Sequence, residues 1–105
     1  MHKTTIYLTP RQHRWLVRRH REQFVTESAV VRLTLEDARK RDRVDIGLGA
    51  EEPDLVKTTT YVAAEQHSWL QSVADVSGVT YSTVVRAVIE AARRSDDPQQ
   101  ELALR

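Results

Sequence analysis

The stretch "HKTTIYLTPRQHRWL", residues 2–16, decides the fold, because the chain repeats it as "VKTTTYVAAEQHSWL" at residues 56–70. A shift of 54 positions aligns residues 3–42 with residues 57–96 without a gap, and 18 of the 40 aligned positions are identical. Self-similarity at a fixed spacing is typical of a repeated structural unit. Two copies are too few for a solenoid, so the repeat indicates a closed pair of units.

Each copy has the pattern of a strand followed by two helices. The segments "TTIYLT" and "TTTYVA" are rich in threonine, tyrosine and β-branched residues, which favours short strands. Pro10 suits the first turn of a helix with Thr9 as its N-cap, and Thr26 and Thr80 stand at the N-cap of a second helix. Apolar residues recur with a helical period in "ESAVVRLTLEDARKR" and "YSTVVRAVIEAARRS".

A single strand leaves its backbone donors and acceptors unpaired, and a second copy supplies the missing partner. The sequence therefore predicts a mainly α-helical fold with a short two-stranded antiparallel ribbon. In it, two strand–helix–helix repeats form a pseudo-two-fold dimer within one chain, with exchange of strands between two chains as the alternative. The predicted organisation is repeat 1 at residues 1–42, a linker at 43–56, repeat 2 at 57–96 and a short polar tail at 97–105. The glycines, proline and acidic residues of the linker predict an exposed connector.

This order of elements resembles the ribbon-helix-helix family of DNA-binding proteins, which are usually symmetric dimers of a short subunit. The resemblance is carried by "KTTIYL" before a helix start, by "HRWL" in the first helix, and by "GVTYSTVVRAVIEAA" at the second turn and last helix. It covers both repeats and implies a fused, tandem member of the family. Phe24 replaces the glycine found at Gly78, so the first turn is expected to differ. Thr60 stands where an apolar residue is expected under the ribbon, which predicts a looser core there.

The resemblance implies that the outward side chains of the ribbon contact DNA bases. A two-stranded ribbon fits the major groove, where each base pair presents a distinct pattern of donors and acceptors. The predicted base-contacting residues are Lys3, Thr5, Tyr7, Lys57, Thr59 and Tyr61. Threonine and tyrosine are also favoured on any solvent-facing strand, which is the alternative interpretation.

Contacts to phosphate are expected at the starts of the second helices, whose free N–H groups and dipole attract anions. The predicted phosphate-binding residues are Thr26, Ser28, Thr80, Ser82, Arg18 and Arg19. Helix capping without DNA is the alternative for the hydroxyl groups. Arginine occupies positions 14, 18, 19 and 21 of the first copy, where the second copy has Ser68, Ser72, Val73 and Asp75. The two halves are therefore expected to hold DNA unequally.

Charge is also divided unequally along the chain. Residues 1–43 hold 11 Lys and Arg against 5 Asp and Glu, whereas residues 44–105 hold 5 against 10. This asymmetry indicates polyanion binding by the first half, although a solvated basic helix would produce the same pattern.

Other chemistry finds little support in the sequence. The chain has no cysteine, which excludes a disulfide scaffold and a thiolate metal site. His13 and His67 occupy aligned positions and His20 stands among arginines, but none has companions at metal-ligand spacing. No catalytic motif is present, so neither enzymatic activity nor a metal or cofactor is predicted.

The expected function is a sequence-specific double-stranded DNA-binding transcriptional regulator, most simply a repressor. The alternatives are an antitoxin that binds a protein toxin and autoregulates its operon, and an accessory protein of plasmid transfer or partition. Antitoxins of this family usually carry a long C-terminal segment, and only residues 97–105 follow the last predicted helix, which favours the regulator. Further copies of the chain on adjacent subsites are an additional candidate partner. No apolar run approaches the roughly 20 residues that span a bilayer, and no secretory signal is present, so a cytoplasmic location is expected.

Overall fold

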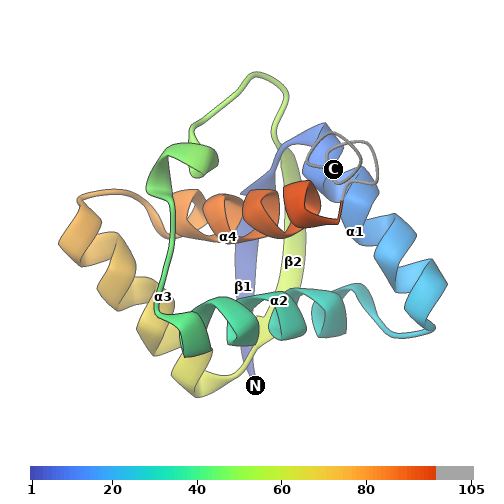
Figure 1. Ribbon diagram of the computed structural model, residues 1–105, viewed down its shortest axis with the longest axis horizontal. Helices are drawn as coiled ribbons and strands as arrows, with labels where there is room; N and C mark the ends of the chain where they lie inside the picture. Colours follow the sequence, from blue (N-terminus) through green and yellow to red (C-terminus); the bar gives the residue numbers. More distant parts are fainter. Residues whose placement is uncertain (97–105) are drawn as a thin grey trace, which may run out of the picture.

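Two strands and four α-helices form the part of the chain that the computed structural model describes, residues 1–96 (Figure 1). In order they are β1 (His2–Leu8), α1 (Pro10–Gln23), α2 (Glu27–Arg41), the short 3₁₀ helix η1 (Ile46–Gly49), β2 (Val56–Val62), α3 (Ala64–Ser77) and α4 (Tyr81–Ser95). The prediction of a mainly helical fold with a two-stranded antiparallel ribbon is confirmed. The predicted tail lies outside the described residues. No helix among residues 1–96 is both long and apolar enough to cross a membrane.

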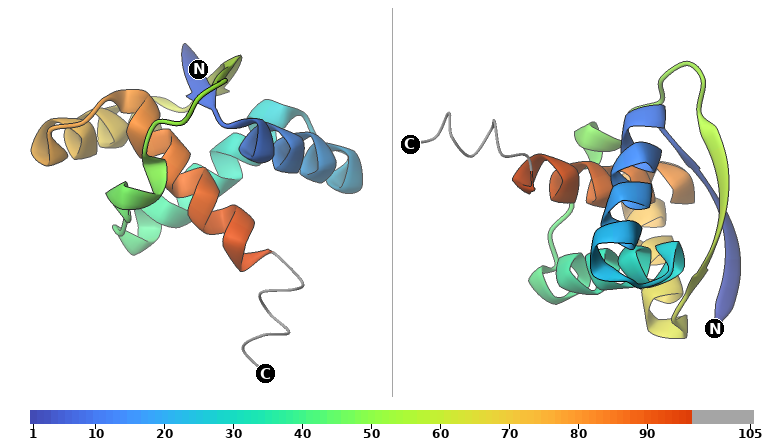
Figure 2. Two further views of the ribbon diagram at one scale, coloured as in Figure 1. Left: turned by 90° about the horizontal axis from the view of Figure 1, so that it is seen from above. Right: turned by 90° about the vertical axis from the view of Figure 1, so that its right-hand side faces the viewer.

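The ribbon lies on one side of the molecule and covers the aliphatic core with its inner face. The helices α2 and α4 cross beneath that face, while α1 and α3 flank the ribbon on either side (Figure 2). Side chains alternate along each strand, so Ile6 and Leu8 of β1 and Thr60 and Val62 of β2 point inward and are buried. Buried helical residues complete the core, among them Leu16, Val30, Val31, Leu35, Leu70, Val84, Val85, Val88 and Ile89.

The predicted helix starts at Thr9, Thr26 and Thr80 are confirmed. Each threonine is extended, and its side-chain oxygen accepts a hydrogen bond from the backbone N–H three residues later. At Thr9 the contact is reciprocal, because the backbone N–H of Thr9 donates to Oε1 of Gln12 at 3.0 Å. This pair forms a capping box, which gives a hydrogen-bond partner to two backbone N–H groups at the start of α1.

The prediction that the first turn differs from the second is wrong. Gly78 ends α3 in the left-handed region with φ 68° and ψ 32°, and Phe24 ends α1 in the same region with φ 56° and ψ 38°. Both turns therefore close with the same backbone conformation. The Phe24 side chain is 94% exposed, so its ring is directed away from the core.

The linker is only in part the exposed connector that its composition predicts. Its middle forms η1, which packs on α4, and Gly49 is buried there. A Cβ atom at Gly49 would lie 2.0 Å from the carbonyl oxygen of Thr83, so only glycine permits this approach. Val44 and Ile46 pack against the core, whereas residues 50–54 are exposed.

Polar contacts between the two halves of the described chain occur in pairs separated by 54 positions. The indole N–H of Trp15 donates to Asp96 at 3.1 Å, and that of Trp69 donates to Asp42 at 3.4 Å. The same spacing relates two glutamine contacts. Gln12 donates to the Arg86 carbonyl and to Glu90, at 3.4 and 3.3 Å, and Gln66 donates to the Arg32 carbonyl and to Glu36, at 3.1 and 3.2 Å. Each half thus contacts the other through the same residue types.

Candidate nucleic-acid interface

The outward face of the ribbon carries the six residues predicted to contact bases. Lys3, Thr5, Tyr7, Lys57, Thr59 and Tyr61 are all exposed on this one surface. The register sets Thr5 opposite Thr59, and each lysine opposite the tyrosine of the other strand. Each strand therefore presents lysine, threonine and tyrosine in the same order, and the two strands run in opposite directions.

These side chains offer the donors and acceptors that base edges require. A lysine ammonium donates to O6 and N7 of guanine, and a threonine pairs a hydroxyl with a methyl group that packs on thymine. Tyr7 and Tyr61 keep 42% and 45% of their surface exposed, although each is a large aromatic residue. Their phenol groups donate or accept hydrogen bonds. The face is thus polar at its centre and positively charged at two diagonal positions.

Two arginines hold the ends of the ribbon on the helices below. Arg32 of α2 donates to the Tyr61 carbonyl at 3.0 Å, and Arg86 of α4 donates to the Tyr7 carbonyl at 2.9 Å. Arg86 is 1% exposed and also donates to the Gly49 carbonyl at 2.9 Å. Its burial lowers the pKa of the guanidinium, while Glu51 and Glu52 act in the opposite direction. These contacts join each tyrosine that is predicted to contact bases to a helix of the other half.

The sequence did not predict a positioning role for these arginines. The available signal was the segment "VVR", which is identical in both copies at residues 30–32 and 84–86. An arginine beside two apolar residues is as easily a solvated side chain. Only the fold shows that it reaches a strand of the opposite half.

The Ser28 hydroxyl, which was predicted to bind phosphate, contacts the ribbon strand of the other half. Its Oγ accepts a hydrogen bond from the Thr60 hydroxyl at 3.1 Å and from the Tyr61 N–H at 3.2 Å. Thr60 is 1% exposed, so this contact satisfies a polar group under the ribbon where a looser core was expected. The contact between two hydroxyl groups has no counterpart at Ser82, because Ile6 takes the place of Thr60 and has no hydroxyl. Thr58, which pairs with Ile6, has the one buried side-chain oxygen without a hydrogen-bond partner among residues 1–96.

The starts of α2 and α4 keep exposed hydroxyl groups beside free backbone donors. The Thr26 Oγ1 accepts from the Ala29 N–H at 3.0 Å, and the Thr80 Oγ1 accepts from the Thr83 N–H at 3.1 Å. The capping bond does not use the hydroxyl hydrogen of Thr26, so that hydrogen can donate to an anion. The Thr80 hydroxyl also lies 2.8 Å from the Thr83 hydroxyl, and either of the two can be the donor. The first N–H groups of a helix and its dipole favour the same ligand. Capping and phosphate binding are therefore compatible at these two positions.

The aligned histidines have different partners at the two ends of the ribbon. The His67 ring stacks on His2 with centroids 4.7 Å apart and contacts the Tyr81 hydroxyl through Nδ1 at 3.2 Å. His13 Nε2 instead lies 3.8 Å from Glu27. His20 Nδ1 contacts the Val25 carbonyl in the turn after α1. Within residues 1–96, no three His, Cys, Asp or Glu side chains are grouped as metal ligands would be.

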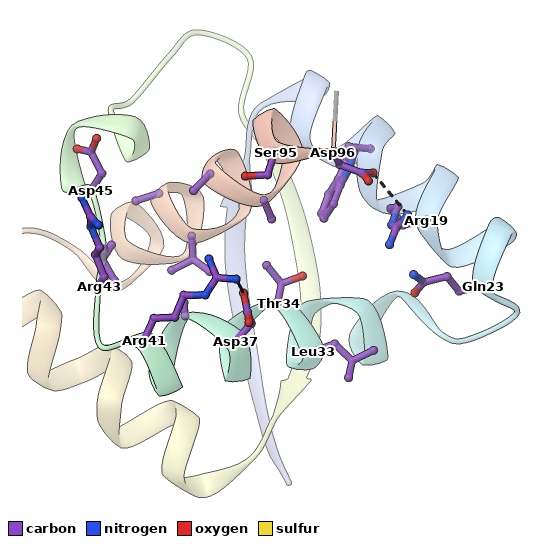
Figure 3. Close-up of a pocket in the computed structure, with 17 residues that line it drawn as sticks. Arg19, Gln23, Leu33, Thr34, Asp37, Arg41, Arg43, Asp45, Ser95 and Asp96 are labelled. Atoms are coloured by element: carbon purple, nitrogen blue, oxygen red, sulfur yellow. Dashed lines mark hydrogen bonds and ion pairs between the residues drawn. The ribbon is translucent and has the colours of Figure 1, made fainter. Parts of the chain in front are cut away.

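Arg18 and Arg19 lie apart from the predicted phosphate sites. Both are near Asp96 at the end of α4, at 3.9 and 3.5 Å, and both are near Glu22, at 3.7 and 3.8 Å. Arg19 also lines a groove between α2 and α4 on the side away from the ribbon (Figure 3). This placement does not support a DNA contact by Arg19.

Comparison of the chain with protein-family models, with curated proteins and with solved structures finds no match.

Proposed function

We propose that the chain is a sequence-specific double-stranded DNA-binding transcriptional regulator of the repressor type. In this proposal the β1–β2 ribbon enters the major groove and its outward side chains contact base edges. The observation that carries it is the exposed row of lysine, threonine and tyrosine, which repeats in the same order from both ends of the ribbon. Solvent exposure alone would not require the same three residue types in both strands.

The ribbon is proposed to belong to two ribbon-helix-helix repeats that pair within one chain. The support comes from the contacts that recur 54 positions apart: Trp15 with Asp96 and Trp69 with Asp42, and likewise the two glutamines and the two arginines that reach across. A symmetric homodimer would make such contacts between two identical chains. Here each contact has a counterpart within the same chain.

Phosphate groups on either side of the major groove are proposed to contact the starts of α2 and α4. Thr26 and Thr80 would donate their hydroxyl hydrogens, together with the first backbone N–H groups of each helix. Such contacts set the orientation of the protein on the duplex, and the ribbon supplies the sequence preference.

A titration of DNA binding tests this function. The target is the duplex that the unaltered chain selects from a random double-stranded pool. Replacement of Lys3 and Tyr7 by alanine should weaken binding by about 5- to 150-fold per lost contact, because a good base contact contributes about 1–3 kcal/mol. The variant should keep the circular dichroism spectrum of the parent, since both side chains are exposed.

The control variant is Lys40→Ala, which removes one positive charge from the exposed end of α2. It should lose little affinity for the selected duplex. Unchanged affinity of the Lys3→Ala/Tyr7→Ala variant, or an equal loss in the control, would contradict base contact by the ribbon.

A further inference from the structure

Thr83 of α4 lies between a buried cation and the start of its helix, where a phosphate contact is proposed. Its Oγ1 accepts a hydrogen bond from Nη2 of Arg86 at 3.1 Å and lies 2.8 Å from Oγ1 of Thr80. Thr80 is exposed and caps α4, because its Oγ1 also accepts from the Thr83 N–H at 3.1 Å. These three residues, the Arg86–Thr83–Thr80 network, therefore connect the interior of the protein to its surface.

Arg86 brings a positive charge to the inner end of this network. The residue is 1% exposed, and its guanidinium donates to three neutral oxygens, which are two backbone carbonyls and the Thr83 hydroxyl. Glu51 and Glu52 attract this charge, but Arg86 forms no ion pair with a carboxylate among residues 1–96. A buried charge is costly unless an opposite charge compensates it. An anion at the outer end of the network would therefore stabilise this arrangement.

The guanidinium also favours one direction for the hydrogen bond between the two hydroxyl groups. Because an N–H of Arg86 points at the Thr83 oxygen, the positive charge repels the hydroxyl hydrogen of Thr83 and directs it toward Thr80. The Thr80 oxygen then accepts both this hydrogen and the Thr83 N–H, and its own hydrogen is left to donate to the surface. Hydrogen bonds aligned in one direction strengthen one another.

The start of α2 has no equivalent network. The residues aligned with Thr80, Thr83 and Arg86 are Thr26, Ala29 and Arg32. Arg32 donates to a strand carbonyl as Arg86 does, but Ala29 has no hydroxyl that could connect this guanidinium to Thr26. The network is therefore a feature of one half, although the cation and the cap are present in both.

We propose that Thr83 and Arg86 are positioning residues for a contact between Thr80 and a DNA phosphate. The charge of Arg86 acts through the Thr83 hydroxyl, which directs the Thr80 hydrogen at the phosphate. Arg86 also donates to the Tyr7 carbonyl, so one guanidinium holds both this contact and the strand of a residue predicted to contact bases. The inference rests on the proposed function and names the residues that act behind one of its phosphate contacts.

The test compares two duplexes, the one that the parent chain selects and a copy with one phosphate replaced by an uncharged methylphosphonate. The phosphate to replace is the one whose ethylation weakens binding of the parent but not of a Thr80→Ala variant. Thr83→Val removes the hydroxyl and keeps the shape of the side chain. It should weaken binding to the unmodified duplex by about 2- to 12-fold, the range that corresponds to one hydrogen bond. Its binding to the methylphosphonate duplex should equal that of the parent.

Two further variants serve as controls. Thr83→Ser keeps the hydroxyl and should bind both duplexes as the parent does. Thr34→Val makes the same substitution on α2, where the hydroxyl donates to the Val30 carbonyl of its own helix, and it should also bind as the parent does. Equal losses by Thr83→Val on the two duplexes would overturn the proposal, because the residue would then act on the fold and not on the phosphate. Unchanged affinity of Thr83→Val, or the absence of a phosphate that depends on Thr80, would also overturn it.

The protein without DNA allows a second measurement. Neutron diffraction from crystals of the deuterated chain locates hydroxyl deuterium atoms, and that of Thr83 should lie between the Thr83 and Thr80 oxygens. A Thr80 deuterium in this place would overturn the proposal, whatever the protein binds. A parent chain that selects no duplex would contradict the proposed function, whereas the neutron structure still decides whether Arg86 and Thr83 direct the Thr80 hydroxyl.

Discussion

Phe24 and Gly78 occupy aligned positions with the same left-handed backbone conformation. Comparing them gives the free-energy cost of placing a side chain at that conformation. A left-handed conformation costs an L-residue roughly 1–2 kcal/mol, a cost that glycine does not have. The exposed ring of Phe24 recovers little of it through burial. Phe24→Gly should therefore raise the free energy of unfolding by about 0.5–1 kcal/mol, after allowance for the greater freedom of glycine in the unfolded chain.

The reciprocal substitution checks the same argument with the opposite sign. Gly78→Ala should lower the free energy of unfolding by about 1 kcal/mol. A Cβ there meets nothing within 4 Å among the described residues, so the loss reports the backbone alone. Urea unfolding followed by circular dichroism measures both variants. Destabilisation by Phe24→Gly would show that the phenylalanine makes a favourable contact that outweighs its backbone strain.

Gly49 is required for a different reason, which is space. Its added Cβ would clash with the backbone of α4, at 2.0 Å from the Thr83 oxygen, and backbone atoms cannot rotate away as a side chain can. Gly49→Ala should lower the free energy of unfolding by about 1–3 kcal/mol, the usual range for an overpacked interior. The control is Gly47→Ala, whose Cβ would meet only the Asp45 side chain at 3.4 Å. Equal unfolding midpoints for the two variants in urea would contradict the tight packing of η1 on α4.

Among the elements, α2 and α4 each carry a carboxylate that joins the halves. Hydrogen bonds from Arg39 and Gln66 lower the pKa of Glu36 to about 2. Burial acts to raise the pKa of Glu90, but hydrogen bonds from Arg93, Arg94 and Gln12 outweigh it and hold this pKa at about 2. Each glutamine comes from a helix of the opposite half. Both carboxylates thus stabilise the packing of one half on the other in their ionised form.

This arrangement predicts loss of stability in acid. The folded-state pKa values lie below the ordinary value of 4.5, so the unfolded chain binds more protons between pH 4.5 and 2. The stabilisation is complete above pH 4.5 and declines as the pH falls toward 2. Urea midpoints at pH 7, 4.5 and 2.5 should show this decline in the parent chain.

Substitution tests whether Glu36 and Glu90, and not the other acidic residues, cause the loss of stability in acid. A Glu36→Gln/Glu90→Gln variant should be less stable than the parent at pH 7 and should lose less stability between pH 4.5 and 2.5. Asp75→Asn, at an exposed position on α3, should leave the pH dependence of the parent in place. A double variant with the same acid dependence as the parent would exclude these two groups as its source.

The elements themselves were predictable because their residues follow local rules. Threonine, tyrosine and β-branched residues predicted the two short strands, and the threonines before the second helix of each copy predicted the caps at Thr26 and Thr80. The packing of η1 was not predictable, since glycines in a linker indicate a turn as readily as a close approach. The partners of Gln12 and Ser28 were also hidden, because periodicity assigns a residue to a face but not to a partner on another element. The exposure of the six predicted base-contacting residues is confirmed, whereas their role at DNA stays a prediction.

At the scale of the whole molecule, the two halves share their inner contacts but differ on the outside. Arginines on α1 at positions 11, 14, 18 and 21 align with Glu65, Ser68, Ser72 and Asp75 on α3. The linker covers α4, while the aligned surface of α2 is left open by the described residues. A chain with such unlike flanks, if it binds DNA as proposed, should prefer one orientation on an asymmetric site, because the basic flank gains more from nearby phosphates.

Cleavage of DNA from a tethered iron chelate tests this orientation. The chelate is attached to Glu22→Cys on α1 or to Val76→Cys on α3, two exposed positions that are 54 residues apart and therefore aligned. Each variant should cut the selected duplex on one flank of the ribbon site, and the two variants should cut opposite flanks. A symmetric pair of chains with exchanged strands would place each chelate on both flanks, as would a single chain bound in both orientations. Equal cutting of the two flanks by each variant would therefore contradict a fixed orientation, and light scattering of the free protein would then distinguish a dimer from a single chain bound both ways.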